Sequence, residues 1–253
     1  MIDIEEKKIR IIQSIRDQSK FKQREVERII NKSFREIPAG VRLAYDKYGL
    51  GEKKVLDIGS GFGSSLMYWG KGSAAVEVQP VIVRFLKEMG FNVYELNVEE
   101  GLGIKVRNKF DAVYSMNLIE HLVAPHLFLL RVHKLLKNGG LFVLGHPTTP
   151  LWPFESLWKM YFGYQGWVSV EHVNFFTPKT IELMLNRAGF EVENQLNPGL
   201  ISKSVPKSVQ QFFVWCGADV ISVARKKKFR YDSKRVKDFS PRWASDVFVY
   251  HGK

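Results

Sequence analysis

Apolar residues recur every three or four positions in residues 5–36, with charged residues between them. These positions are Ile9, Ile12, Ile15, Val26, Ile29, Ile30 and Phe34. This spacing predicts amphipathic helices. The polar run 17–20 predicts a break between two helices, and Pro38-Ala39-Gly40 predicts the end of the region. We expect the apolar stripe to pack on the rest of the protein, although a lid, a dimer contact or a docking surface would use the same stripe.

From Lys53 onward, short apolar runs alternate with stretches of helical spacing. The expected strands are 54–58, 74–78, 91–94, 110–115, 141–145, 190–192 and 219–224. The expected helices run from a glycine-rich turn to about Trp69, over 81–89, over 126–136, and from the cap Thr177-Pro178 to Ala188. This alternation predicts an α/β fold with a doubly wound, mostly parallel sheet.

Residues 146–176 interrupt the alternation with nine aromatic residues and three prolines. An apolar surface of this kind can form an acceptor pocket or a lid, and a flap that covers the sheet edge is the alternative. We therefore expect three parts: a helical extension over 1–40, an α/β domain over 41–225 that contains this insert, and a tail over 226–253.

Composition limits the class of protein. The 253 residues are 45% hydrophobic and 25% charged, enough for one globular domain with a sizeable core. Cys216 is the only cysteine, which excludes a disulfide within the chain. The first residues are charged, and no run of about 18 apolar residues occurs, so the sequence predicts a cytoplasmic protein without a membrane span.

The net charge of +12 is concentrated at one end. Residues 225–253 hold ten Lys or Arg and three Asp or Glu, a net charge of +7, whereas residues 37–224 are close to neutral. A basic tail favours an anionic partner such as nucleic acid or an anionic membrane surface, and a solvated end is the alternative. Oligomeric state is not indicated.

The glycine-rich turn 57–63, Asp-Ile-Gly-Ser-Gly-Phe-Gly, is the most specific motif. Glycines at this spacing allow a tight turn and close approach of a ligand to the backbone. Asp57 stands two residues before the first glycine, where it would repel a pyrophosphate but attract a cation. Glu77 ends the next strand, where a carboxylate can accept hydrogen bonds from ribose hydroxyls. These features together predict S-adenosylmethionine, which carries a sulfonium and an amino group, as the cofactor.

Residues 50–225 resemble the class I S-adenosylmethionine-dependent methyltransferases, most closely the ubiquinone-biosynthesis-like (methyltransferase type 11/23) group. The resemblance is carried by the turn 57–63, Glu77, the segment 110–122 that ends in Glu-His-Leu, the turn 135–141, and the segment 171–190. It implies a Rossmann-like seven-stranded sheet whose last strand is antiparallel and lies between the fifth and sixth strands. Asn97 stands where the family often has Asp against the adenine amine.

The turn and the resemblance together give a set of expected cofactor-binding residues. They are Asp57, Gly59, Ser60, Gly61, Gly63, Glu77, Val78, Asn97, Val98, Met116 and Asn117. No cluster of histidines and carboxylates at metal-ligand spacing is evident in the sequence, so no metal site is expected.

Methyl transfer needs a base only when the acceptor must lose a proton. The candidates are His121 and His146, which follow expected strands at the edge where ligands of this fold bind, and His172 in the insert, with Glu171 beside it. A packing or hydrogen-bonding role is the alternative for each histidine.

Three functions are compatible with this sequence. The first is O-methylation of a small-molecule or lipid-linked acceptor, because residues 115–118 lack the Asn/Asp-Pro-Pro-aromatic pattern of amino-methylating nucleic-acid enzymes. The second is methylation of RNA or protein recruited through the basic tail. The third is a protein that binds S-adenosylmethionine without turnover.

Overall fold

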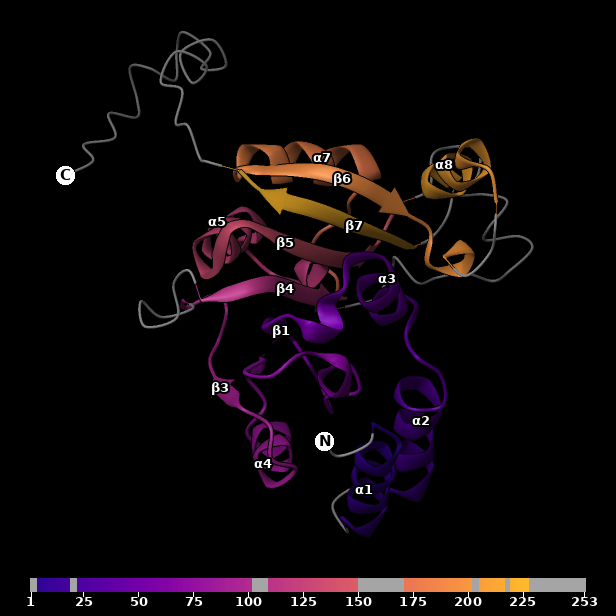
Figure 1. Cartoon of the computed structure of the whole chain (residues 1–253), viewed down its shortest axis with the longest axis vertical. Helices are drawn as coiled ribbons and strands as arrows, with labels where there is room; N and C mark the ends of the chain where they lie inside the picture. The colour runs from indigo at the N-terminus through magenta and orange to yellow at the C-terminus, as the bar shows by residue number, and fades with distance from the viewer. Residues whose placement is uncertain are drawn as a thin grey trace, which may run out of the picture.

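The computed structural model describes residues 4–18, 22–101, 109–149, 171–201, 205–216 and 219–227. Its strands form one seven-stranded sheet in the order β3-β2-β1-β4-β5-β7-β6 (Figure 1). The strands are β1 Val55–Ile58, β2 Ala74–Glu77, β3 Val93–Glu95, β4 Phe110–Met116, β5 Leu136–Pro147, β6 Phe190–Leu196 and β7 Asp219–Lys226.

Strands β1 to β5 pair in parallel, whereas β7 pairs antiparallel with both β5 and β6. The predicted doubly wound, mostly parallel sheet with an antiparallel last strand is therefore confirmed. All four residues of β1 and of β2 are buried, as expected for strands that are covered on both faces.

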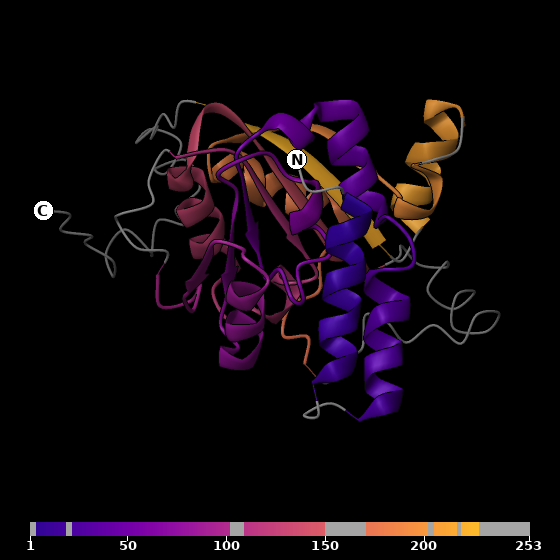
Figure 2. The same cartoon turned by 60° about the horizontal axis from the view of Figure 1, so that its bottom comes forward.

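Helices cover both faces of the sheet (Figures 1 and 2). They are α1 Ile4–Asp17, α2 Gln23–Ser33, α3 Ala39–Tyr48, α4 Pro80–Glu88, α5 Pro125–Leu135, α7 Pro178–Arg187 and α8 Lys207–Cys216. Helices α5 and α7 share one buried core with the sheet, and α1 to α4 share the other. The sequence predicted α1, α2, α4, α5 and α7 but not α3 or α8.

The N-terminal helices α1 and α2 form an antiparallel pair beside the sheet (Figure 2). Their ends are joined by an ion pair of 3.5 Å between Arg16 and Glu27. Ile11 and Ile15 of α1, together with Val26 and Ile30 of α2, are buried in the same core as residues of β1 and β2. The apolar stripe therefore packs on the domain, as the sequence predicted.

The helix expected between the glycine turn and Trp69 does not form. Only the 3₁₀ turn η2, Leu66–Tyr68, lies between Gly63 and β2, and α1 packs against it. About ten residues separate Gly63 from β2, and the last of these, which include Gly70 and Gly72, form another turn. Too few residues remain for a stable helix. The predicted helix was wrong because the segment between the glycine turn and β2 is too short for one.

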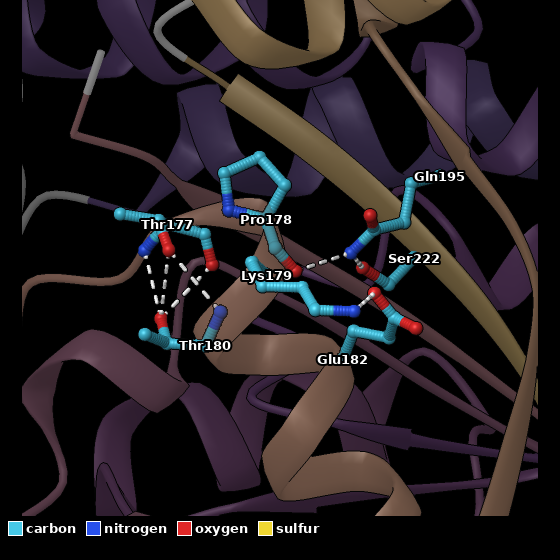
Figure 3. A network of polar contacts seen from close by, with 7 residues as sticks. All are labelled: Thr177, Pro178, Lys179, Thr180, Glu182, Gln195 and Ser222. Atoms are coloured by element: carbon cyan, nitrogen blue, oxygen red, sulfur yellow. Dashed lines mark hydrogen bonds and ion pairs between the residues drawn. The ribbon is translucent and has the colours of Figure 1, made fainter. Parts of the chain in front are cut away.

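Helix α7 is fixed at its start by hydrogen bonds to the backbone and to the neighbouring strands (Figure 3). Thr177 and Thr180 form a reciprocal capping box, in which the Thr180 amide donates to Thr177 Oγ1 at 3.1 Å. Gln195 of β6 donates to the Pro178 carbonyl at 2.8 Å and to Ser222 of β7 at 3.3 Å. These contacts fix the segment that leads into α7.

Replacing Thr177 with Ala removes the side-chain half of this cap. We expect the free energy of unfolding to fall by about 1 kcal/mol, a typical value for a lost N-cap. Replacing Thr177 with Ser keeps the hydroxyl and serves as the matched control. Urea unfolding of the two variants tests this, and equal losses in both would contradict a role for the cap.

The remaining expectations concern the outer parts of the chain. None of the helices in the described ranges has the length and apolar content that a membrane span requires. Most of the aromatic insert and of the tail 226–253 lies outside the described residues, so the expected roles of these segments, and the three-part division, stay predictions.

Candidate functional site

The expected cofactor-binding residues lie at the carboxyl ends of four adjacent strands. Asp57, the glycine turn, Glu77, Asn97 and Met116 end or follow β1, β2, β3 and β4, which are neighbours in the sheet. Ligands of open α/β sheets bind at this edge. The structure thus brings the expected cofactor-binding residues, which span positions 57 to 117 in the sequence, to one edge of the sheet.

The glycine turn depends on backbone conformations that favour glycine. Gly59, Gly61 and Gly63 have φ angles of 76°, 52° and 78°. A Cβ atom at Gly63 would lie 2.7 Å from Leu86 Cδ2, whereas a Cβ at Gly61 would meet nothing within 4 Å. Gly63 is therefore needed for packing as well as for its φ angle, and the side of the turn at Gly61 is open to a ligand.

Asp57 lies beneath the turn rather than on its open side. Its side chain is 2% exposed, and Oδ2 accepts hydrogen bonds from Ser65 Oγ and, at 3.3 Å, from Trp69 Nε1. Burial raises the pKa of Asp57 to about 6, although these two donors act in the opposite direction. The sequence missed Ser65 and Trp69 as supports, and a contact of Asp57 with a cationic cofactor stays a prediction.

Replacing Asp57 with Asn should stabilise the cofactor-free protein, and increasingly so as the pH rises. The pKa of Asp57 is raised from its ordinary value of 3.8 to about 6 in the folded protein, so ionisation opposes folding. Stability that the wild type has at low pH is lost as the pH rises through about 6. Between about pH 4.5 and pH 7.5 the advantage of the variant should grow by about 2 kcal/mol.

Chemical unfolding of both proteins across this pH range measures the difference, which cancels the titration of all other groups. Asn keeps a carbonyl oxygen for Ser65 and Trp69, so the hydrogen bonds are matched. If the difference in free energy of unfolding between the two proteins does not change with pH, the pKa of Asp57 is not raised by folding.

Glu77 connects β2 to the glycine turn. Its Oε2 accepts a hydrogen bond of 3.1 Å from the Gly61 amide, and Oε1 accepts bonds of 2.9 and 3.1 Å from the amides of Val78 and Gln79. The carboxylate thus lies beside the open side of the turn. Val78 is 54% exposed next to it and offers an apolar surface. A carboxylate and an apolar side chain in this arrangement fit a ribose and an adenine ring.

Ser60 adds a second observation that fits a polar ligand at the turn. Its Oγ atom is buried and, among the described residues, has no hydrogen-bond partner. Buried hydroxyls are normally hydrogen-bonded, so this position is suited to a polar group of a bound molecule.

The loop after β3 is held mainly by its own residues. Asn97 Oδ1 accepts from the Glu99 amide at 3.0 Å, and Asn97 Nδ2 donates to Glu100 at 3.0 Å. Arg131 of α5 donates to the carbonyl oxygens of Val98 and Glu99. Val98 is 8% exposed and joins the core. The amide of Asn97 thus fixes the loop shape, and its contact with adenine stays a prediction.

The end of β4 carries a strained backbone. Asn117 has a φ of 50° and is the only residue of the described ranges other than glycine with a positive φ. Its amide donates to the Gly145 carbonyl at 2.9 Å, which fixes the end of β4 against β5. Met116 packs over Gly145 and Gly40, where a Cβ would collide with its side chain. Strained residues of this kind concentrate at ligand sites.

A cluster of titratable side chains follows directly. Glu120 and His121 lie on the 3₁₀ turn η4, Ile119–His121, and His172 approaches them from the other end of the insert. The His121 and His172 rings lie 4.8 Å apart, and His121 Nε2 lies 3.9 Å from Glu120 Oε1. Glu120 is 1% exposed, and burial raises its pKa. The sequence predicted both histidines as catalytic candidates but missed Glu120, although its Glu-His-Leu segment contains it.

The cluster adjoins the turn. Leu118, which precedes η4, packs against Gly59, whose Cβ would lie 3.5 Å from its side chain. Ser115 of β4 donates to the Ile58 carbonyl at 3.0 Å at the end of β1. The glycine turn and the Glu120–His121–His172 cluster, named the acidic-histidine cluster below, therefore belong to one edge of the sheet.

His146, the third candidate histidine, lies at the end of β5. It is 1% exposed, its Nδ1 is 2.9 Å from the Pro147 carbonyl, and its ring contacts Phe176. Burial lowers the pKa of His146 to about 4, so the ring is neutral near pH 7. These contacts fit the packing alternative, but Nε2 is buried without a hydrogen-bond partner among the described residues, and a catalytic role for His146 stays a prediction.

The strand order, the glycine turn after β1 and the carboxylate after β2 define a Rossmann-like methyltransferase. A family model described as "Methyltransferase domain" matches residues 18–195, and the chain belongs to this family. The family match identifies an S-adenosylmethionine-dependent methyltransferase, which confirms the expected cofactor. The ubiquinone-biosynthesis-like subgroup stays a prediction.

Solved structures share the fold at low sequence identity. An S-adenosylmethionine-dependent methyltransferase from Thermotoga maritima is 21% identical, with a TM-score of 0.52 over 79% of this chain and 98% of that one. The YcgJ protein from Bacillus subtilis is 14% identical, with a TM-score of 0.54 over 75% and 99% of the two chains. The [4+2]-cyclase SpnF is 15% identical, with a TM-score of 0.53 over 87% and 93%. No curated protein matches the sequence.

Proposed function

We propose that this chain transfers the methyl group of S-adenosylmethionine to an oxygen atom of a small-molecule or lipid-linked acceptor. The observation that carries the proposal is the acidic-histidine cluster, which lies at the carboxyl end of β4 beside the glycine turn. An oxygen acceptor loses a proton during methylation, and basic groups at this position provide a route for that proton.

The residues at the turn fit the cofactor. Gly59 and Gly61 would allow the cofactor to approach the backbone of the turn closely. Glu77 would accept hydrogen bonds from the ribose hydroxyls, and Val78 would contact the adenine ring. The bound cofactor supplies an activated methyl group on a sulfonium. Asp57, held below the turn by Ser65 and Trp69, would place its negative potential under the cationic part of the ligand.

The transfer is an in-line displacement. The acceptor oxygen forms the new bond to the methyl carbon while the carbon–sulfur bond breaks and its electron pair stays on sulfur. The hydroxyl proton of the acceptor leaves to the acidic-histidine cluster or to solvent. Because the sulfur leaving group needs no protonation, the chain contributes mainly by positioning the acceptor and by removing this proton.

RNA is the second candidate acceptor, and a different feature of the structure suggests it. A cavity of about 440 Å³ at the amino edge of the sheet is lined in part by Lys47, Lys53, Lys137 and Arg225. The basic tail begins at this edge. However, Lys137 pairs with Asp111 at 2.7 Å and Arg225 pairs with Glu193, and the cavity lies at the end of the sheet opposite the glycine turn. These contacts favour the small-molecule acceptor.

Methyl transfer from labelled S-adenosylmethionine to matched panels of phenolic and lipid-like alcohols, RNA and protein tests the proposal. We expect transfer to a hydroxyl compound that is lost in His121→Gln and retained in His126→Gln, an exposed histidine of α5. Transfer to RNA that weakens steeply with salt would favour the second candidate. Cofactor binding without transfer to any acceptor class would contradict both.

A further inference from the structure

The acidic-histidine cluster is assembled from two parts of the chain that the backbone ties together. Glu120 and His121 belong to η4, and the amides of Val173 and Asn174 both donate to the Glu120 carbonyl at 3.0 Å. Asn174 Nδ2 also donates to the Leu122 carbonyl. His172, which precedes these residues, is therefore held against η4 although about 50 residues separate it from His121 in the sequence.

Three potential metal-ligand atoms converge in this cluster. One ligand atom each from Glu120, His121 and His172 lies within 4.8 Å of the other two. Nitrogen and oxygen ligands lie about 2.0–2.2 Å from a zinc-like ion, so two of them can be at most about 4.4 Å apart. Small side-chain rotations would bring all three into that range.

His121 is already in the tautomer that a metal ligand needs. Its Nδ1 lies 3.0 Å from the Glu171 carbonyl, which can only accept a hydrogen bond, so Nδ1 carries the proton. Nε2 then has a free electron pair, and it is this atom that lies 3.9 Å from Glu120 Oε1. A ring N–H that donates to a carbonyl while the other nitrogen binds the ion is the usual arrangement around metal-binding histidines.

Glu120 provides an independent indication that a positive charge belongs here. Its side chain is 1% exposed, and among the described residues Oε2 has no hydrogen-bond partner. A buried carboxylate is costly unless it is paired or binds a metal. Lys and Arg side chains make no ion pair with Glu120 in the part of the chain that the structure describes.

We propose that Glu120, His121 and His172 bind a divalent transition-metal ion. Two imidazoles and a carboxylate suit zinc, iron or manganese better than magnesium, which prefers oxygen ligands. If the proposed O-methylation is correct, the ion would bind the acceptor oxygen and favour loss of its proton. The metal site itself does not depend on the nature of the acceptor.

Binding of Co²⁺ to the full-length chain tests the site directly, because tetrahedral Co²⁺ absorbs visible light strongly. After chelator treatment and dialysis, we expect the wild type to bind one equivalent of Co²⁺, which Zn²⁺ displaces and Mg²⁺ does not. His121→Gln and His172→Gln should each weaken binding by at least about tenfold. His126→Gln is the matched control and should bind like the wild type.

His172 is partly exposed, so His172→Gln should fold even if the buried Glu120→Gln does not, and circular dichroism checks both. Absence of stoichiometric binding in the wild type, or equal binding in the variants of His121 and His172, would overturn the metal site. Methyl transfer to a hydroxyl compound by protein shown to be free of metal would overturn the role of the ion in the reaction, whereas Co²⁺ binding decides the site itself. Metal binding without methyl transfer would instead support the metal site and overturn the proposed function.

Discussion

Replacing Glu77 with Gln is expected to weaken binding of S-adenosylmethionine about 100-fold, equal to a loss of about 3 kcal/mol. In the structure the Glu77 carboxylate accepts three backbone hydrogen bonds, from Gly61, Val78 and Gln79, and faces the open side of the turn. Hydrogen bonds to a charged group contribute about 1.5–3 kcal/mol each. Gln keeps the size of the side chain but loses the charge and one of its two acceptors.

Isothermal titration with S-adenosylmethionine and S-adenosylhomocysteine measures the effect. Glu95→Gln is the matched control, since Glu95 is exposed and lies directly opposite Glu77 in the pairing of β2 with β3. A thermal unfolding scan without cofactor shows how much of the loss comes from a loosened turn. An affinity within about threefold of the wild type would exclude Glu77 from the ribose site.

Replacing Gly63 with Ala is expected to lower the free energy of unfolding by about 3 kcal/mol. Its φ of 78° opposes any side chain, and the added Cβ would lie 2.7 Å from Leu86 Cδ2 and 3.1 Å from Leu66 Cδ1. Leu86 is fully buried and Leu66 is 6% exposed, so neither can move away freely. Left-handed strain and overpacking therefore add.

Gly61→Ala separates the two contributions. Gly61 has a φ of 52°, but its Cβ would meet nothing within 4 Å, so a loss of only about 1 kcal/mol is expected from strain. Cofactor affinity should nevertheless fall, because the added methyl stands on the open side of the turn. Urea unfolding and titration of the same two variants give both values. Equal stability losses would show that contact with Leu86 has no cost.

The sheet and the cofactor edge could be predicted from sequence because both depend on local patterns. Strands such as β1 and β4 are buried apolar runs, and the glycines of the turn mark backbone angles that other residues avoid. The order of these elements placed Glu77 at the correct strand end. The antiparallel β7 came from the resemblance rather than from its own residues.

The features that could not be predicted depend on contacts between distant residues. The acidic-histidine cluster joins Glu120 to His172, and no spacing rule connects two positions so far apart. Helix α3 begins immediately after Pro38, which looked like the end of a helical region. The burial of Asp57 depends on hydrogen bonds from Ser65 and Trp69. These two residues flank η2, which stands where the sequence predicted a longer helix.

The N-terminal helices also set an order of events during synthesis. Their buried residues, such as Ile11 and Val26, share a core with Ala75 of β2 and Leu86 of α4. The first and last of these residues are roughly 75 positions apart, and contacts of such separation form later than those within a helix. The helices are synthesised before the sheet, so their apolar stripes stay uncovered until η2, β1, β2 and α4 have been made. A newly made chain therefore has an interval in which this surface is open to chaperones and to aggregation.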